Sequence, residues 1–169
     1  MEQNLVKIGR NTEVEIVGHA TYVPAKVDTG ADSSSVWATN IYVDPDHTLH
    51  YTLFGKVSAF YTGQEISTKD FKATMVTNST GHKQIRYRVR LSMKLERRRI
   101  RVMVTLADRS RNTFPILIGR RTLHGKFIVD VSINEISYQN ETHVMGLNEE
   151  LQKDPHAFHK KYYGKSKIK

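Results

Sequence analysis

The residues best suited to chemistry in this chain form one short segment, Lys26-Val27-Asp28-Thr29-Gly30-Ala31-Asp32-Ser33. An apolar approach delivers Asp28 into a tight turn of small residues. Thr29 can donate a hydroxyl hydrogen bond to nearby backbone, and Gly30 permits a close backbone approach that a side chain would block. Such a turn holds a carboxylate in one orientation, so we interpret Asp28 as the catalytic group. An ordinary Asx turn is the alternative, since so short a pattern also arises by chance.

A second motif lies far downstream, where the apolar run Phe114-Pro115-Ile116-Leu117-Ile118 ends in Gly119-Arg120. Together, the Asp-Thr-Gly-Ala turn and this strand resemble the retropepsin-like aspartic peptidases, the family of the retroviral proteases. The resemblance covers roughly Glu13 to Val131. More narrowly, three segments look like a bacterial branch that carries the label ATP-dependent zinc protease and is associated with ATP-grasp glutamate ligases, namely Ala25–Ser35, Val76–Gly81 and Leu106–Leu123.

The resemblance implies an all-β fold, a retropepsin-like closed acid-protease barrel with a flap hairpin and one short helix after Gly119. We expect this peptidase domain to occupy residues 1–145. Residues 146–169 are expected to form a basic tail that is partly helical or disordered, with two turns of helix over 147–153 that end before Pro155.

The resemblance also implies which residues hold the catalytic turn in place. The Gly119-Arg120 element is expected to pack beneath the turn. Arg120 should then reach back to Asp32, because an isolated, partly buried charge is costly. The expected supporting residues are Thr29, Gly30, Ala31, Asp32, Gly119 and Arg120.

Peptide hydrolysis at such a motif needs a second carboxylate. In an aspartic peptidase, two carboxylates share one proton and hold a water between them, because two like charges so close cannot both ionise. One is the general base toward the water, and the other, protonated, donates to the developing oxyanion. The sequence contains one Asp-Thr-Gly. We therefore expect a two-fold homodimer in which Asp28 of each protomer meets its twin on the axis.

A hairpin is expected between Phe71 and Leu91, with small polar residues at its tip. In the resemblance this hairpin is the flap, which closes over a bound peptide and excludes water. An exposed hairpin without that role is the alternative. The expected flap tip consists of Asn78, Ser79, Thr80, Gly81 and His82.

Nearly strict alternation from Gln84 to Leu95 indicates a strand with one basic face, which carries Arg86, Arg88 and Arg90. A solvated face is the usual fate of such charge, but guanidinium groups also pair bidentately with carboxylate or phosphate. On that face, no aromatic residue interleaves with the arginines to form a base-stacking platform. An acidic polypeptide is therefore favoured as the substrate, and the resemblance to a companion of glutamate ligases favours glutamate-rich tails. Contact with a ribosome or RNA remains open.

The rest of the chain is predicted to form short strands around the Asp28 turn. Leu5–Ile8 begins the sheet, and the Gly18-His19 break suggests a hairpin. A strand pair is expected from His47 through Phe54 and Val57 to Tyr61, and a last strand over Lys126–Val131 could pair at the dimer interface. Trp37 is expected in the core.

Composition excludes several functions. The chain has no cysteine, which excludes disulfides, thiolate zinc sites and cysteine nucleophiles. The histidine pairs His47/His50 and His156/His159 lack an accompanying metal-binding motif, and no Walker-type loop is present, so we expect no metal and no cofactor. No secretion signal or membrane-spanning run is evident, so a cytoplasmic location without membrane contact is expected.

The sequence thus predicts a homodimeric aspartic endopeptidase that uses Asp28 as its acid and base. A peptide- or ribosome-binding module that kept the fold without turnover is the alternative.

Overall fold

The computed structural model describes residues 4–78, 80–136 and 149–163. The chain divides into two compact units, Met1–Ser137 and Tyr138–Lys169. The predicted boundary at residue 145, residues 146–148 of the predicted tail and Ser79 of the predicted flap tip lie outside the described residues.

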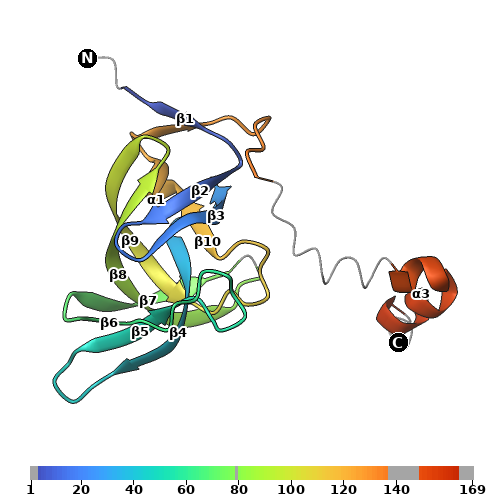
Figure 1. Cartoon of the computed structure of the whole chain (residues 1–169), viewed down its shortest axis with the longest axis horizontal. Helices are drawn as coiled ribbons and strands as arrows, with labels where there is room; N and C mark the ends of the chain where they lie inside the picture. The colour runs from blue at the N-terminus through green and yellow to red at the C-terminus, as the bar shows by residue number, and fades with distance from the viewer. Residues whose placement is uncertain (1–3, 79, 137–148, 164–169) are drawn as a thin grey trace. The chain divides into compact units, whose positions relative to one another are not determined.

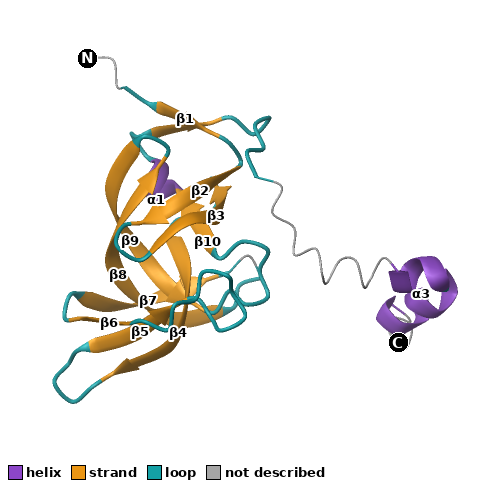
Figure 2. Ribbon diagram, in the orientation of Figure 1, coloured by secondary structure: helices purple, strands orange, loops and turns teal. Residues whose placement is uncertain are grey.

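The first unit is a closed β-barrel, as predicted (Figures 1 and 2). Six strands form the ring, each paired with the next, and the pairing of the last strand with the first closes it. In order around the ring, these strands are β10 (Ile116–Gly119), β3 (Ala20–Asp28), β2 (Asn11–Ile16), β8 (Lys83–Leu95), β9 (Arg98–Ala107) and β4 (Ser34–Val43).

Additional strands extend the ring. β5 (Leu49–Leu53) and β6 (Glu65–Thr68) continue the sheet beyond β4, and β7 (Phe71–Thr77) pairs with the first half of β8. β1 (Val6–Ile8) and β11 (Phe127–Val129) form a separate two-stranded parallel sheet. The predicted short helix after Gly119 is present as α1 (Arg120–Leu123).

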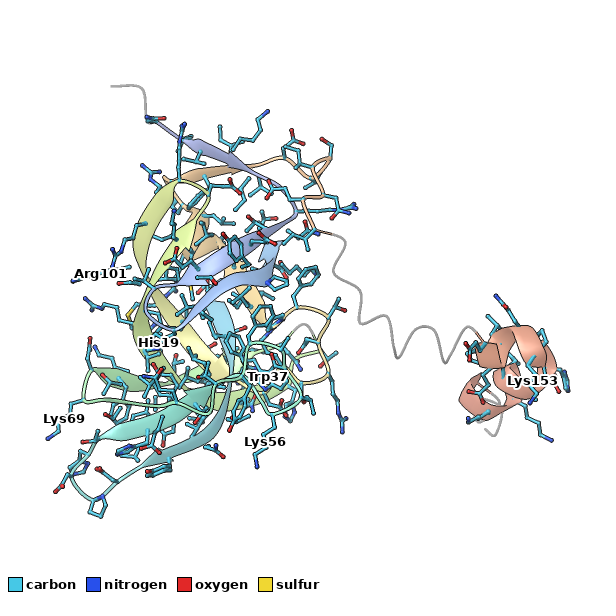
Figure 3. All side chains as sticks on the ribbon, viewed as in Figure 1. His19, Trp37, Lys56, Lys69, Arg101 and Lys153 are labelled. Atoms are coloured by element: carbon cyan, nitrogen blue, oxygen red, sulfur yellow. The ribbon has the colours of Figure 1, made fainter. Side chains whose placement is uncertain are left out.

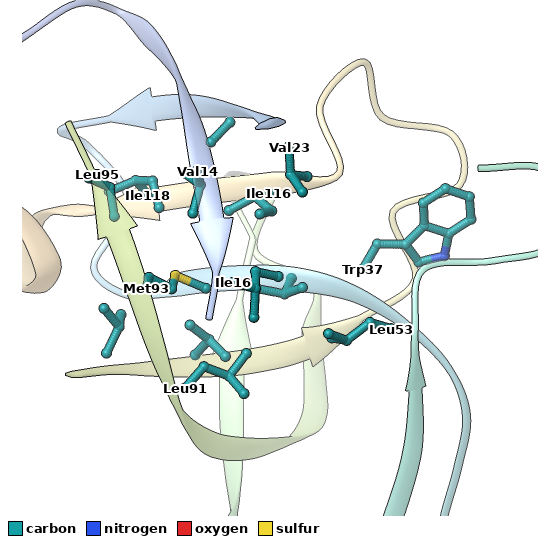
Figure 4. Close-up of a cluster of buried hydrophobic side chains, with 14 of the residues drawn as sticks. Val14, Ile16, Val23, Trp37, Leu53, Leu91, Met93, Leu95, Ile116 and Ile118 are labelled. Atoms are coloured by element: carbon teal, nitrogen blue, oxygen red, sulfur yellow. The ribbon is translucent and has the colours of Figure 1, made fainter. Parts of the chain in front are cut away.

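Apolar side chains that alternate along the strands fill the barrel (Figure 4). On β8, Val89, Leu91, Met93 and Leu95 are buried as their period-two spacing predicts. Ile85 has the same phase but is 66% exposed. The reason is that this half of β8 leaves the ring and pairs only with β7.

Trp37 is buried in the core, as predicted, at 8% exposure. Gly55 lies against its ring, where an added Cβ would come within 2.6 Å of the indole. The predicted strand over Val57–Tyr61 is wrong, because residues 55–61 form consecutive turns. Ser58 organises them, since its backbone N–H donates to the Gly55 carbonyl at 2.8 Å and its hydroxyl accepts from the Phe60 N–H.

The second unit contains helical residues 149–153 and α3 (Pro155–Tyr163). Helix formation beyond Pro155 was not predicted. Asp154 caps α3 by accepting a hydrogen bond from the Ala157 N–H at 2.9 Å. Proline is favoured at the first position of a helix, so Pro155 ends one helical segment and begins the next.

Candidate active site

Asp28 ends strand β3 and is held by the turn that follows it. Its Oδ1 accepts hydrogen bonds from the backbone N–H groups of Gly30 and Ala31, both at 3.0 Å. The side chain is half-buried. Within the described part of the chain, its Oδ2 accepts no hydrogen bond. The turn therefore orients the carboxylate with one oxygen and leaves the other for a ligand.

Strand β10 positions this turn from below. Its Gly119 is in register with Asp28 on the parallel neighbour β3. An added Cβ at Gly119 would lie 2.6 Å from the backbone of Ser33, so only glycine fits. The Gly119 N–H donates to the Ser34 hydroxyl at 3.0 Å, and that hydroxyl lies 2.7 Å from the hydroxyl of Thr122. These contacts join the catalytic turn to the start of α1.

Asp32 makes the expected contact with Arg120, at 3.2 Å. It also pairs with Arg121 at 2.7 Å, a partner that the sequence did not suggest. The Arg120 and Asp32 side chains are 62% and 45% exposed, so the pair is not the buried contact that was expected. Thr29 is exposed as well, and its hydroxyl makes no hydrogen bond among the residues described.

A cleft of about 870 Å³ opens in front of Asp28. The catalytic turn forms one wall, and the β7–β8 hairpin contributes Thr74–Asn78. We call this space the catalytic cleft, after the role that the sequence predicts for Asp28. It thus brings together the two sequence motifs and the segment predicted as the flap, which are far apart along the chain.

The hairpin tip is closed by its own hydrogen bonds. The Asn78 carboxamide oxygen accepts from the N–H and hydroxyl of Thr80 and from the His82 N–H, at 2.7 to 3.1 Å. Gly81 has φ +81°, which glycine adopts readily. Asn78 lies in the lining of the catalytic cleft.

The predicted basic face divides along β8. Arg86 and Arg88 line the catalytic cleft. Arg90, on the same strand, is not among the lining residues and lies 3.7 Å from Asp70. Burial lowers the pKa of Arg86.

Arg109 is the cleft residue that the sequence did not single out. It is 9% exposed and lines the catalytic cleft. Its guanidinium donates to the Phe114 carbonyl at 3.0 Å and to the Ser35 hydroxyl at 3.1 Å. Burial lowers its pKa to about 10, with a further decrease from Arg86 and an opposing increase from Asp28. Arg109 is therefore a buried cation close to the Asp28 carboxylate.

Of the histidine pairs noted in the sequence, His47 precedes β5 and His50 lies on it, while His156 and His159 lie in α3. His50 is held between Asp44 at 2.9 Å and Glu65 at 3.0 Å. Over residues 4–78, 80–136 and 149–163, no group of three histidine or carboxylate side chains is arranged to hold a metal ion. In the same ranges, no helix is long and apolar enough to cross a membrane.

The profile of the RimB-like family, described as retropepsin-like aspartic endopeptidase RimB, matches residues 7–140. The chain belongs to this family. The match covers all six strands of the ring together with the catalytic turn and the Gly119-Arg120 element. The predicted resemblance to the retropepsin-like peptidases is thereby confirmed.

Two further proteins are similar to this RimB-like chain. A protein of Desulfotalea psychrophila named probable alpha-L-glutamate ligase is 25% identical over 114 residues, which are 66% of this chain and 25% of the ligase. The chain thus spans about a quarter of that relative's length. The name of the relative agrees with the predicted association with glutamate ligases. The crystal structure of Lpg0085 from Legionella pneumophila, a protein with unknown function, shares the fold with a TM-score of 0.56 and 24% identity, covering 79% of this chain and 98% of that one.

Proposed function

We propose that this chain is the subunit of a homodimeric aspartic endopeptidase that hydrolyses peptide bonds in acidic, glutamate-rich polypeptides. The observation that carries the proposal is the position of Asp28. Its carboxylate is oriented by two backbone N–H groups and opens into a cleft lined by four arginines, Arg86, Arg88, Arg109 and Arg121.

The requirement for two carboxylates supports the dimer. Only Asp28 and Asp32 supply carboxylates to the described lining of the catalytic cleft. Both oxygens of Asp32 are engaged by Arg120 and Arg121. Because each of its oxygens already contacts an arginine, Asp32 is poorly placed to hold a water together with Asp28. The second acid of the dyad would therefore be Asp28 of the partner subunit, in a two-fold arrangement.

In this dimer, one Asp28 carboxylate would take a proton from a water molecule as the water attacks the scissile carbonyl carbon. The other Asp28, protonated, would donate to the carbonyl oxygen as negative charge develops there. Proton transfer to the amine leaving group then completes cleavage. The β7–β8 hairpin would serve as the flap, closing over the peptide and excluding bulk water.

The charge of the cleft supports an acidic substrate. Arg109 is the clearest sign, because it is 9% exposed and its hydrogen-bond partners are neutral. A buried cation without a paired anion is costly. The Asp28 carboxylate is one anionic group near Arg109, and a substrate carboxylate beside Arg109 and Arg86 would supply a second. The name of the Desulfotalea relative, probable alpha-L-glutamate ligase, favours glutamate as the source of that carboxylate.

The first test compares Asp28→Asn with the wild type on a glutamate-rich peptide. We expect kcat to fall by at least about 100-fold, because an amide cannot act as general base. Asp70→Asn is the matched control, since Asp70 is an exposed carboxylate outside the cleft lining. A hydroxyl isostere of the transition state should inhibit, and a metal chelator should not. Unchanged cleavage by Asp28→Asn would overturn the proposal.

The same variant separates enzyme from binding module. If the wild type binds the acidic peptide and never cleaves it, while Asp28→Asn binds equally well, the non-catalytic alternative holds. Dimer formation is measured by sedimentation velocity. Specific activity should fall as the protein is diluted below the dimer dissociation constant, because the isolated subunit lacks half of the dyad.

A further inference from the structure

A second cavity, of about 280 Å³, has a lining that overlaps with that of the catalytic cleft. Its cationic lining residues are Arg88, Arg101, Arg121 and Lys126, and none of the described residues that line it carries a carboxylate. Ser33, Arg88 and Arg121 line both spaces. We call it the basic side cavity. Its charge and its shared wall suggest one continuous surface for an anionic chain.

Strand β9 connects the two spaces. Thr105 lines the catalytic cleft, while Met103 and Arg101 line the basic side cavity. These residues alternate along the strand and therefore share one face. Val102 and Val104 lie on the opposite face and are buried, and Val102 also lines the basic side cavity together with Ile100. From Thr105 to Arg101 the strand rises about 13 Å, the length of roughly four residues of an extended peptide.

Two guanidinium groups in the basic side cavity have unused hydrogen-bonding capacity. The Nε of Arg88 is shielded from solvent and has no acceptor within the described chain. A buried donor without an acceptor is costly, so such groups call for a functional explanation. Arg101 is exposed and, as far as the described residues go, makes no hydrogen bond or ion pair (Figure 3).

The other two cationic side chains that line the basic side cavity already have hydrogen-bond partners. Arg121 already pairs with Asp32, and the Lys126 ammonium donates to the His124 carbonyl at 3.2 Å. Four cations around one small space repel one another, and an anion between them would relieve the repulsion.

We propose that the basic side cavity is a distal binding site for a carboxylate side chain of the substrate, about four residues away from the bond that is cleaved. This inference rests on the proposed function and deepens it. Arg88 and Arg101 would donate charge-assisted hydrogen bonds to that carboxylate. An acidic peptide running along β9 would be held at the catalytic cleft and at the basic side cavity together. Long glutamate-rich tails are then preferred over short acidic peptides.

The test compares Arg101→Gln with Arg99→Gln. Both changes remove one charge from an exposed position on β9, but Arg99 does not line the basic side cavity. The substrates are a long all-glutamate peptide, the same peptide with glutamine at the residues most distant from the scissile bond, and a short all-glutamate peptide that does not reach Arg101. Unfolding followed by the fluorescence of Trp37, the single tryptophan, checks that both variants are folded.

We expect Arg101→Gln to lower kcat/KM for the long all-glutamate peptide by about tenfold, the scale of one lost hydrogen bond to a charged group. It should have no effect on the short peptide or on the distally neutral one, and Arg99→Gln should resemble the wild type. Equal values for the two variants on all three peptides would overturn the distal site.

Binding by fluorescence anisotropy, on a background of Asp28→Asn, separates this inference from the proposed function. If the wild type cleaves nothing but Arg101→Gln still weakens binding of the long peptide, the distal site stands and the peptidase fails. If an RNA oligonucleotide binds more tightly than the long glutamate peptide and loses affinity in Arg101→Gln, the cavity is a phosphate site and the carboxylate assignment is overturned.

Discussion

The Asp32 carboxylate lies 2.7 Å from the guanidinium of Arg121. Arg120, the partner expected from the sequence, contacts the other carboxylate oxygen at 3.2 Å. Two adjacent arginines at the start of α1 therefore hold the end of the catalytic turn. Because all three side chains are substantially exposed, the arrangement is weaker than a buried ion pair.

We predict that Arg120→Ala lowers the free energy of unfolding by less than about 1 kcal/mol, because exposed ion pairs contribute little and Arg121 retains Asp32. Urea denaturation followed by tryptophan fluorescence measures this. The double variant lacking both arginines should lose more than the sum of the single variants. Strict additivity would show that the two arginines do not substitute for each other.

Gly119→Ala is predicted to destabilise the barrel by about 1–3 kcal/mol, because its Cβ would meet the backbone of Ser33 at 2.6 Å. The catalytic turn should shift with it, so hydrogen exchange at the Gly30 and Ala31 amides should accelerate. Gly125→Ala is the control, since the space around Gly125 is open and only its φ of +67° is strained. Gly125→Ala should lose stability without faster exchange of the Gly30 and Ala31 amides. Faster exchange of these amides in Gly125→Ala than in Gly119→Ala would contradict the packing argument.

Asn78→Ala is predicted to loosen the tip of the β7–β8 hairpin. The Asn78 carboxamide oxygen accepts three hydrogen bonds within the tip. Losing even one net hydrogen bond, about 1 kcal/mol, should speed exchange of the His82 amide by roughly fivefold. Asn78→Asp retains the acceptor and should restore slow exchange. Equal exchange in Asn78→Ala and the wild type would show that other contacts hold the tip.

The β4–β5–β6 extension should depend on pH through His50. The hydrogen bond to Asp44, followed by that to Glu65, raises the pKa of His50 above its ordinary 6.5, and the hydrogen bond from His50 lowers the pKa of Asp44 below 3.8. A raised histidine pKa stabilises the fold below pH 6.5, and this stability is lost as pH rises through the raised value. A lowered aspartate pKa stabilises above 3.8, and that stability is lost as pH falls through the lowered value.

The contribution of this cluster is therefore greatest between pH 3.8 and pH 6.5, the ordinary pKa values of the two groups, and declines outside that range. Protease susceptibility of residues 44–68, measured from pH 4 to 9, should increase above neutrality in the wild type. His50→Gln should remove that increase. A wild-type profile that stays flat through neutrality would contradict the role of His50.

Much of the barrel could be predicted because its strands carry local signals. The alternation in β8 and the apolar run before Gly119 reflect burial on one or both faces, which a sequence displays directly. Residues 55–61 show the limit of this reasoning. Their apolar and aromatic residues resemble a strand, yet Gly55 must lie against Trp37 and the Ser58 hydroxyl offers the backbone a turn. Whether residues 55–61 form a strand or turns therefore depends on Trp37, which is distant in the sequence.

The candidate site follows the same rule. Asp28 and Gly119 stand in motifs and could be proposed from the sequence. Arg109 could not, because its burial depends on Ser35 and Phe114, and the surrounding turn is rich in polar residues that predict exposure. A charged side chain in a polar loop gives no local sign that the fold will enclose it.

The parallel pairing of β3 with β10 has a consequence for synthesis of the chain on the ribosome. Asp28 emerges early, but the strand that fixes its turn ends at Gly119 and is translated much later. A nascent polypeptide therefore lacks the strand that supports the Asp28 turn until the residues up to Gly119 have been synthesised. Assembly of this centre is timed by chain elongation, which keeps incomplete products from presenting the finished geometry.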